Sequence, residues 1–196
     1  MVTPSKDLEE SIKNAADTAK SLNHEYVTTE HVLYSMLSNQ GFVDIINGFG
    51  SNASTLRKTV SDHLINKSKD ITSADTVIHP KKTASFERMM NKAFTQVIFN
   101  NRQVVEITDA FLMIMNEKRS WAFYYIQKAE IDKDKFADYL NNTIDEEDTE
   151  VEQDPGSNRQ IFGNGSPTNK HRHGTGSTTP DDIFFTFCII GHAINI

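Results

Sequence analysis

The chain has a single cysteine, Cys188, and no apolar stretch as long as a membrane-spanning helix. One cysteine cannot form an internal disulfide, so nothing in the sequence requires an oxidising compartment, and we expect a cytoplasmic protein. The only long apolar run, residues 183–196, is shorter than the ~20 residues that cross a bilayer. The start of the chain also lacks the charged-then-apolar order of a secretory signal. We therefore expect no membrane partner.

The chain also lacks a basic patch. Its formal net charge is −7, from 27 acidic and 20 basic residues. Residues 1–144 hold 18 acidic and 17 basic residues, and residues 145–196 hold 9 acidic and 3 basic ones. A near-neutral body followed by an acidic tail offers no electrostatic footprint for nucleic acid, which favours clustered Lys and Arg. Nucleic acid is therefore not an expected partner.

Strand patterns are missing as well, because neither half of residues 1–144 alternates apolar and polar positions. Apolar residues instead recur at the three- and four-residue spacing of one buried helical face. This spacing is seen in eight segments, around residues 8–22, 32–37, 42–46, 56–65, 86–98, 111–115, 121–126 and 136–144. The sequence therefore predicts an all-α body, in which Gly41 ends the second helix.

The helical pattern occurs twice. The stripe that starts at Leu8 returns at Phe86, and Thr108 precedes its apolar run much as Thr28 precedes Val32. We predict two tandem pseudo-repeats of a four-helix bundle, offset by about 78 to 80 residues. They would occupy about residues 5–66 and 83–144 of a domain over 1–144, followed by a disordered tail. Residues 145–182, acidic and then rich in Gly, Ser and Pro, read as a flexible linker; the status of the short apolar terminus, 183–196, stays open.

The stretch "HEYVTTEHVL", residues 24–33, is the most distinctive polar cluster of the body. Zinc ligands on one helix usually stand four residues apart, whereas His24 and His31 stand seven apart. A helix start explains more of the cluster. Thr28 can cap the helix by accepting a first-turn N–H bond worth roughly 1 kcal/mol, and Glu30 meets the positive end of the helix dipole. Glu25 lies before the cap, where no packing rule asks for a carboxylate.

Catalytic motifs are scarce. The lone cysteine lies in the tail, and no serine stands in G-x-S-x-G. The "GNGSPTNK" stretch departs from the phosphate-binding G-x-x-x-x-G-K-[ST] pattern and follows no predicted strand. We predict no catalytic residue, cofactor or metal, and assign Thr28 and Thr108 as structural caps. A small helical hydrolase remains an alternative that would need a convergent polar pocket.

Four segments of the chain carry a resemblance to a known family. They are "LEESIKNAADTAKSLNHEYVTTEHVLYSMLSN" (8–39), "LRKTVSDHL" (56–64), "TASFERMMNKAF" (83–94) and "EITDAFLMI" (106–114). The sequence resembles the N-terminal domain, or double Clp repeat, of Clp/Hsp100 unfoldases, and is most similar to the ClpA branch. The resemblance covers about residues 5–144, although the sixth predicted helix is one residue shorter than the family pattern.

The resemblance implies a docking module rather than an enzyme. In ClpA-like proteins a flexible linker joins this domain to ATPase modules that pass unfolded substrates to the ClpP peptidase, and the domain binds the adaptor ClpS. It thus implies a ClpS-type adaptor and unfolded or N-degron substrates as partners. Glu25, Glu30 and Thr83 match the family's adaptor contacts. No ATPase motif is present, so ClpP would be reached only through modules that this chain lacks. The chain could be a truncated subunit or a stand-alone decoy that sequesters adaptors and inhibits degradation.

Overall fold

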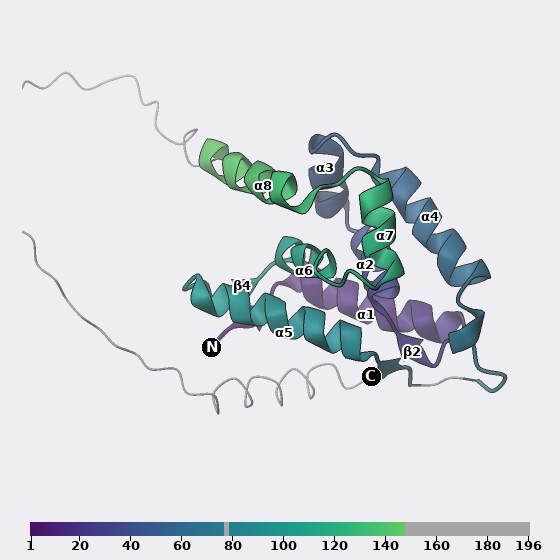
Figure 1. The fold of residues 1–196 in the computed structure, drawn as a ribbon. Helices are drawn as coiled ribbons and strands as arrows, with labels where there is room; N and C mark the ends of the chain where they lie inside the picture. The colour runs from purple at the N-terminus through teal and green to yellow at the C-terminus, as the bar shows by residue number, and fades with distance from the viewer. Residues whose placement is uncertain (77–78, 148–196) are drawn as a thin grey trace, which may run out of the picture.

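The computed structural model describes residues 1–76 and 79–147, which form a mostly helical body (Figure 1). The first repeat contains α1 (Lys6–Ser21), α2 (Thr29–Met36), α3 (Gln40–Gly48) and α4 (Ala53–Asn66). The second contains α5 (Ala84–Phe99), α6 (Ile107–Ile114), α7 (Trp121–Lys128) and α8 (Lys133–Glu147). A short 3-10 helix, η1 (Lys69–Ile71), follows α4. The all-α fold with two four-helix repeats is confirmed for the described residues.

The two repeats correspond residue by residue over their first halves. Helix α5 begins at residue 84 and α1 at residue 6, an offset of 78 that also relates α6 at 107 to α2 at 29. Two residues after the first helix of each repeat, Asn23 and Asn101 both adopt left-handed backbone, with φ of 57° and 55°. After α6 the offset grows to 81, because α7 begins at residue 121 and α3 at residue 40.

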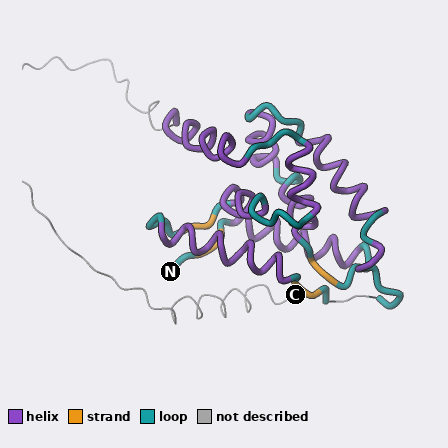
Figure 2. The backbone as a smooth tube through the Cα atoms, viewed as in Figure 1, coloured by secondary structure: helices purple, strands orange, loops and turns teal. Residues whose placement is uncertain are grey.

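Four two-residue strands link the repeats. They are β1 (Thr3–Pro4), β2 (Tyr26–Val27), β3 (Lys81–Lys82) and β4 (Val104–Val105). β1 pairs in parallel with β4, and β2 pairs in parallel with β3, so each repeat pairs its leading strand with the other repeat (Figure 2). These strands were not predicted from the sequence, because two residues are too few to show an alternation.

Side-chain caps explain where most of the helices begin. The side chains of Asn39, Asn52 and Ser120 each accept a hydrogen bond from the backbone amide three residues later, at 2.9, 2.7 and 3.0 Å. Asn39 also explains a wrong boundary. Gly41 was expected to end the second helix, but α2 ends at Met36, and Gly41 lies in the first turn of α3.

One hydrophobic core serves both repeats. Phe111 of α6 is fully buried, and its ring lies 5.1 Å from that of Phe42 in α3 and 5.1 Å from that of Phe136 in α8, measured between centroids. Helices α1 and α2 pack closely, as do α5 and α6, and α2 also contacts α4, α6 and α7. The repeats therefore share a single core rather than forming two domains.

Helix α8 joins the body through aromatic contacts at its start. The ring of Phe49, just after α3, packs against Phe136 and Tyr139 with centroid distances of 5.2 and 5.7 Å. Gly48 permits this contact, since a Cβ placed there would overlap the hydroxyl of Tyr139. From this point α8 leads away from α3 toward the edge of the body (Figure 1).

The predicted linker begins slightly too early. Residues 145–147 were assigned to it, but they form the last turn of α8. The rest of the predicted linker and the apolar terminus, 183–196, lie outside the described residues. Within the described part of the chain, no helix is long and apolar enough to cross a membrane.

Candidate functional site: the corner at β2 and β3

Glu25 and Thr83 flank the strand pair of β2 and β3. The amide of Lys81 donates to the carbonyl of Glu25 at 2.8 Å, and the amide of Thr83 donates to the carbonyl of Val27 at 3.1 Å. Two predicted partner contacts that are far apart in sequence thus lie on one short sheet. Lys81 and Lys82, both exposed, lie between them. We call Glu25, Lys81, Lys82 and Thr83 the β2–β3 corner.

The side chains of the two predicted contacts, Glu25 and Thr83, differ in exposure and in hydrogen bonding within the chain. Glu25 is exposed, and its carboxylate has no hydrogen-bond or ion-pair partner among residues 1–76 and 79–147. Thr83 is half-buried and caps α5, because its Oγ1 accepts from the amide of Phe86 at 3.2 Å. The same hydroxyl donates to the carbonyl of Val27 at 3.2 Å. Glu25 is therefore the freer of the two to meet a partner.

Glu30 does not present its charge outward, so this part of the prediction is wrong. Its side chain is 7% exposed, and Oε1 accepts a hydrogen bond from the amide of Ala122 at 3.0 Å. Ala122 lies in the first turn of α7, where backbone amides lack helical acceptors and the helix dipole favours a negative charge. Glu30 therefore binds the first repeat to the second across a buried contact.

Thr28 is the N-cap of α2, as predicted, and it forms a capping box with His31. The amide of Thr28 donates to Nδ1 of His31 at 3.1 Å, so the ring proton of neutral His31 must lie on Nε2. That nitrogen is 2.9 Å from Nδ1 of His24, which therefore acts as the acceptor. The two histidines of "HEYVTTEHVL" thus form a buried hydrogen-bonded pair rather than two free ligands.

Burial keeps this histidine cluster neutral. Burial is the largest cause that lowers the pKa of His31 to about 3, and the nearby His24 and His63 rings also contribute to this lowering. Burial also lowers the pKa of His24, although the carboxylate of Asp70 partly opposes this shift. Burial likewise lowers the pKa of His63, where the carboxylates of Glu30 and Asp70 oppose it. His63 bonds the hydroxyl of Tyr125 at 3.1 Å. The cluster is therefore a structural network between α2, α4 and α7.

Thr108 is not a cap, and this prediction is also wrong. Helix α6 begins at Ile107 with Glu106 as its N-cap, so Thr108 lies inside the first turn. Oδ2 of Asp109 accepts from the amide of Glu106 at 2.8 Å, and its Oδ1 pairs with Arg102 at 2.8 Å. Glu106 and Asp109 occupy the positions of Thr28 and His31, and the cap therefore lies two residues earlier than predicted.

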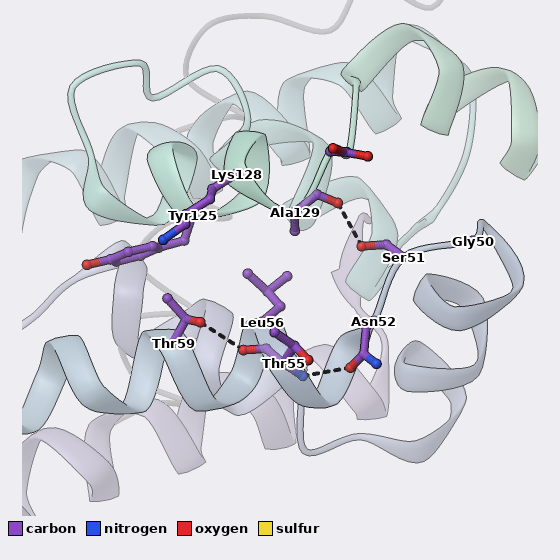
Figure 3. Close-up of a pocket in the computed structure, with 10 residues that line it drawn as sticks. Gly50, Ser51, Asn52, Thr55, Leu56, Thr59, Tyr125, Lys128 and Ala129 are labelled. Atoms are coloured by element: carbon purple, nitrogen blue, oxygen red, sulfur yellow. Dashed lines mark hydrogen bonds between the residues drawn. The ribbon is translucent and has the colours of Figure 1, made fainter.

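A cavity of about 240 Å³ opens between the start of α4 and the end of α7 (Figure 3). At its rim Oγ of Ser51 donates to the carbonyl of Ala129 at 2.9 Å, which fastens the two repeats together. Its charged lining residues are Lys128 and Glu130, and no histidine or cysteine lines it. The described residues also contain no group of three or more His, Cys, Asp or Glu side chains that could hold a metal ion.

Comparison with known proteins relates this architecture to one family. The family model described as "Clp repeat (R) N-terminal domain" matches residues 3–129, which include both strand pairs and the first seven helices. The chain belongs to the Clp N-terminal domain family. The resemblance drawn from the sequence is thereby confirmed.

Relatives and solved structures agree with this assignment. A ClpA homolog protein of Fuscovulum blasticum is 24% identical over 127 residues, which are 65% of this chain and 16% of that protein. The Hsp104 N-terminal domain of Candida albicans has a TM-score of 0.63 at 13% identity, covering 72% of this chain and 91% of that one. The ClpD N-terminal domain of Arabidopsis thaliana has a TM-score of 0.52 at 16% identity, with coverage of 71% and 96%. These structures share the fold of the Clp N-terminal domain.

One buried polar group of this Clp N-terminal domain was not predicted from the sequence. Glu117 is buried in the loop after α6, where it accepts from Arg88 at 2.7 Å and from Lys92 at 3.1 Å. Burial raises the pKa of Glu117, but the hydrogen bonds from both cations outweigh it, so the pKa lies below its usual value. No local motif marks this group. The only available signal was the four-residue spacing of Arg88 and Lys92, which places both cations on one face of α5.

Proposed function

We propose that this Clp N-terminal domain docks a ClpS-type adaptor protein at the β2–β3 corner, on behalf of a ClpA-like unfoldase. The observation that carries the proposal is the pairing of β2 with β3, which brings Glu25 and Thr83 onto one small sheet. Glu30 is not part of this surface, because its carboxylate is committed to Ala122.

The corner has the features of a contact at the rim of an interface. The exposed Glu25 carboxylate can pair with a cation of the adaptor, while the exposed lysines next to it can orient an acidic group. Charges of this kind steer encounter and fix the orientation of the partner more than they add affinity. The adaptor's apolar contacts would then supply most of the binding energy.

The family context supplies the wider role. The adaptor would deliver unfolded or N-degron substrates, and the domain itself would catalyse no reaction. The match to the ClpA homolog protein covers 16% of its length, so unfolding and delivery to a ClpP peptidase would depend on ATPase modules outside this match. We place this action in the cytoplasm, because the single cysteine requires no oxidising compartment.

Calorimetric titration with a purified ClpS-type adaptor tests the proposal. Glu25→Lys should weaken binding roughly tenfold, or about 1.4 kcal/mol, because it replaces an attractive contact by a repulsive one. Glu25→Gln should weaken binding less, and raising the salt concentration should narrow the difference between the two variants.

A charge reversal of the same size at Asp138 provides the control. Asp138 is exposed on α8, far along the chain from the corner, so Asp138→Lys should leave the affinity unchanged. If the adaptor does not bind the unmodified chain, the proposal is wrong. If the two reversals weaken binding equally, the adaptor senses net charge and the β2–β3 corner is not its site.

A further inference from the structure

A polar cavity of about 250 Å³ lies between α1, the end of α2 and the start of α3. Its outer edge carries the carboxylates of Asp7 and Glu10 from α1, and the buried side chains of Ser11 and Ser35 also line it. No lysine or arginine is among its lining residues. In the described part of the chain, neither carboxylate forms an ion pair. The cation bonded to the lining of the cavity is Arg57, whose Nε donates to Oγ of Ser38 at 3.3 Å and whose Nη2 donates to the hydroxyl of Tyr34.

Ser35 gives the cavity a second feature. Its side chain is buried, with 3% of the residue exposed, and Oγ has no hydrogen-bond partner among the described residues. Buried hydroxyl groups are almost always hydrogen-bonded. This hydroxyl has less than 1 Å² of accessible surface, so it can bond a ligand in the cavity only after the Ser35 side chain rotates about its Cα–Cβ bond.

The second repeat shows what fills this place in its own half. With the offset of 78, Ser11 and Ser35 correspond to Met89 and Met113, both of which are buried. The two methionine side chains are longer than the serines that replace them, so the first repeat is hollow where the second is packed.

The charged positions correspond as well. Glu10 and Asn14 of the first repeat stand where Arg88 and Lys92 stand in the second. In the second repeat Nη2 of Arg88 lies 2.7 Å from Glu117, and Nζ of Lys92 lies 3.1 Å from it. The fold therefore accommodates a guanidinium and an ammonium group at this place. In the first repeat the chain supplies acidic and neutral side chains instead of these cations.

We propose that the cavity of the first repeat binds a basic side chain of a partner polypeptide, with an arginine guanidinium as its best ligand. The carboxylates of Asp7 and Glu10 pair with the cation, and the hydroxyl of Ser35, once rotated toward the cavity, accepts one of its N–H groups. Arginine fits better than lysine, because its planar group carries five donors and can reach several acceptors at once. The ligand thereby replaces the cation that Arg88 supplies in the second repeat.

This inference goes beyond the adaptor-docking proposal and does not depend on it. Asp7 and Glu10 lie in the first half of α1, whereas Glu25 follows its far end. Sixteen helical residues span ~24 Å, so the two sites are about the length of the helix apart. A failure of one site would leave the other untouched.

The test is an NMR titration of the full chain with the peptide acetyl-Gly-Arg-Gly-amide. The matched probe is the same peptide with citrulline, which has the shape of arginine but no charge. We expect saturable shifts at the amides of Ser11 and Ser35, and at least tenfold weaker binding of the citrulline peptide. A lysine peptide should fall between the two.

Variants identify the groups that bind. The double substitution Asp7→Asn with Glu10→Gln should weaken arginine binding at least tenfold, whereas Glu9→Gln, on the same helix but outside the cavity lining, should leave it unchanged. Ser35→Met, which copies Met113, should abolish binding by filling the cavity. Each variant is first compared with the parent by its NMR spectrum. The Asp7 and Glu10 substitutions still test the site if Ser35→Met does not fold.

Three results would overturn the proposal. Equal binding of the citrulline peptide would show a polar cavity with no preference for a cation. Shifts of the same amides by calcium or magnesium chloride, without any from the arginine peptide, would show a metal site instead. Unchanged spectra at millimolar peptide would show that the cavity holds only water.

Discussion

His31 should make the stability of this domain sensitive to pH in a range where carboxylates are still ionised. Its ring is fully buried, Nδ1 accepts from the amide of Thr28, and Nε2 faces His24. A proton added to Nδ1 would point at a backbone N–H group at the positive end of α2, so the folded state resists protonation. Burial is the largest cause that lowers the pKa of His31 from 6.5 to about 3, and the nearby His24 and His63 rings also contribute to this lowering.

The size and sign of the effect follow from these two values. Between pH 6.5 and about 3 the unfolded chain binds a proton at His31 that the folded chain does not, so stability falls as the pH falls. A pH of 5 lies about 1.5 units below the pKa of His31 in the unfolded chain, and each unit corresponds to about 1.4 kcal/mol of unfolding free energy. Lowering the pH from 7 to 5 should therefore cost about 2 kcal/mol of unfolding free energy through His31 alone.

Urea denaturation at pH 7, 6 and 5 measures this loss. His31→Gln is the informative variant, because glutamine at the third helical position can still accept in a capping box but does not titrate. The parent should lose about 2 kcal/mol more than this variant between pH 7 and 5. His79→Gln, at an exposed position, should behave like the parent. If the parent and His31→Gln lose stability in parallel, His31 is not held neutral by the fold and the reasoning is refuted.

Three further substitutions test the contacts that hold the repeats together, each by urea denaturation. Glu30→Ala should cost about 1–3 kcal/mol by leaving the buried amide of Ala122 without an acceptor, and Glu30→Gln should cost less; equal costs would argue against this bond. Gly48→Ala should cost roughly 1–3 kcal/mol through overlap with the hydroxyl of Tyr139, and adding Tyr139→Phe should restore much of the loss; no restoration would locate the strain elsewhere. Glu117→Gln should lower the unfolding free energy by at least about 1 kcal/mol at neutral pH. Because its cations lower the pKa of Glu117, this difference from the parent should shrink as the pH falls through the range in which carboxyl groups titrate. A difference that does not change with pH would contradict this.

The helices could be predicted because their signal is local. Leu8 and Phe86 open apolar stripes with helical spacing, and both are buried. Boundaries were less certain where two local signals competed. Gly41 resembles a helix end, but Asn39 caps the next helix and places the glycine inside its first turn. The β strands gave no signal, since their pairing depends on residues of the other repeat.

The candidate site could be predicted only in part, because burial of a side chain is decided by distant segments. Glu30 was assigned to the surface from the family resemblance, but its carboxylate bonds Ala122, which lies 92 residues later. Thr108 was assigned as a cap from its residue type and from its place before an apolar run, like that of Thr28 in the first repeat. The real cap is Glu106, a residue type that is not among the preferred N-caps, so composition alone pointed to the wrong position.

The β2–β3 corner forms only while the two repeats stay packed together, because each repeat contributes one of its paired strands. The β2–β3 corner contains Glu25 from the first repeat and Thr83 from the second, joined by backbone bonds from Lys81 and Thr83. Two paired residues contribute little stability of their own, so packing elsewhere must hold the strands together. That packing includes the bond from Ala122 to Glu30 and the shared core around Phe111. A partner that binds only when the two strands are paired therefore also stabilises the repeats against separation. Conversely, a substitution that removes the bond between Glu30 and Ala122 should weaken docking, although Glu30 does not contact the partner.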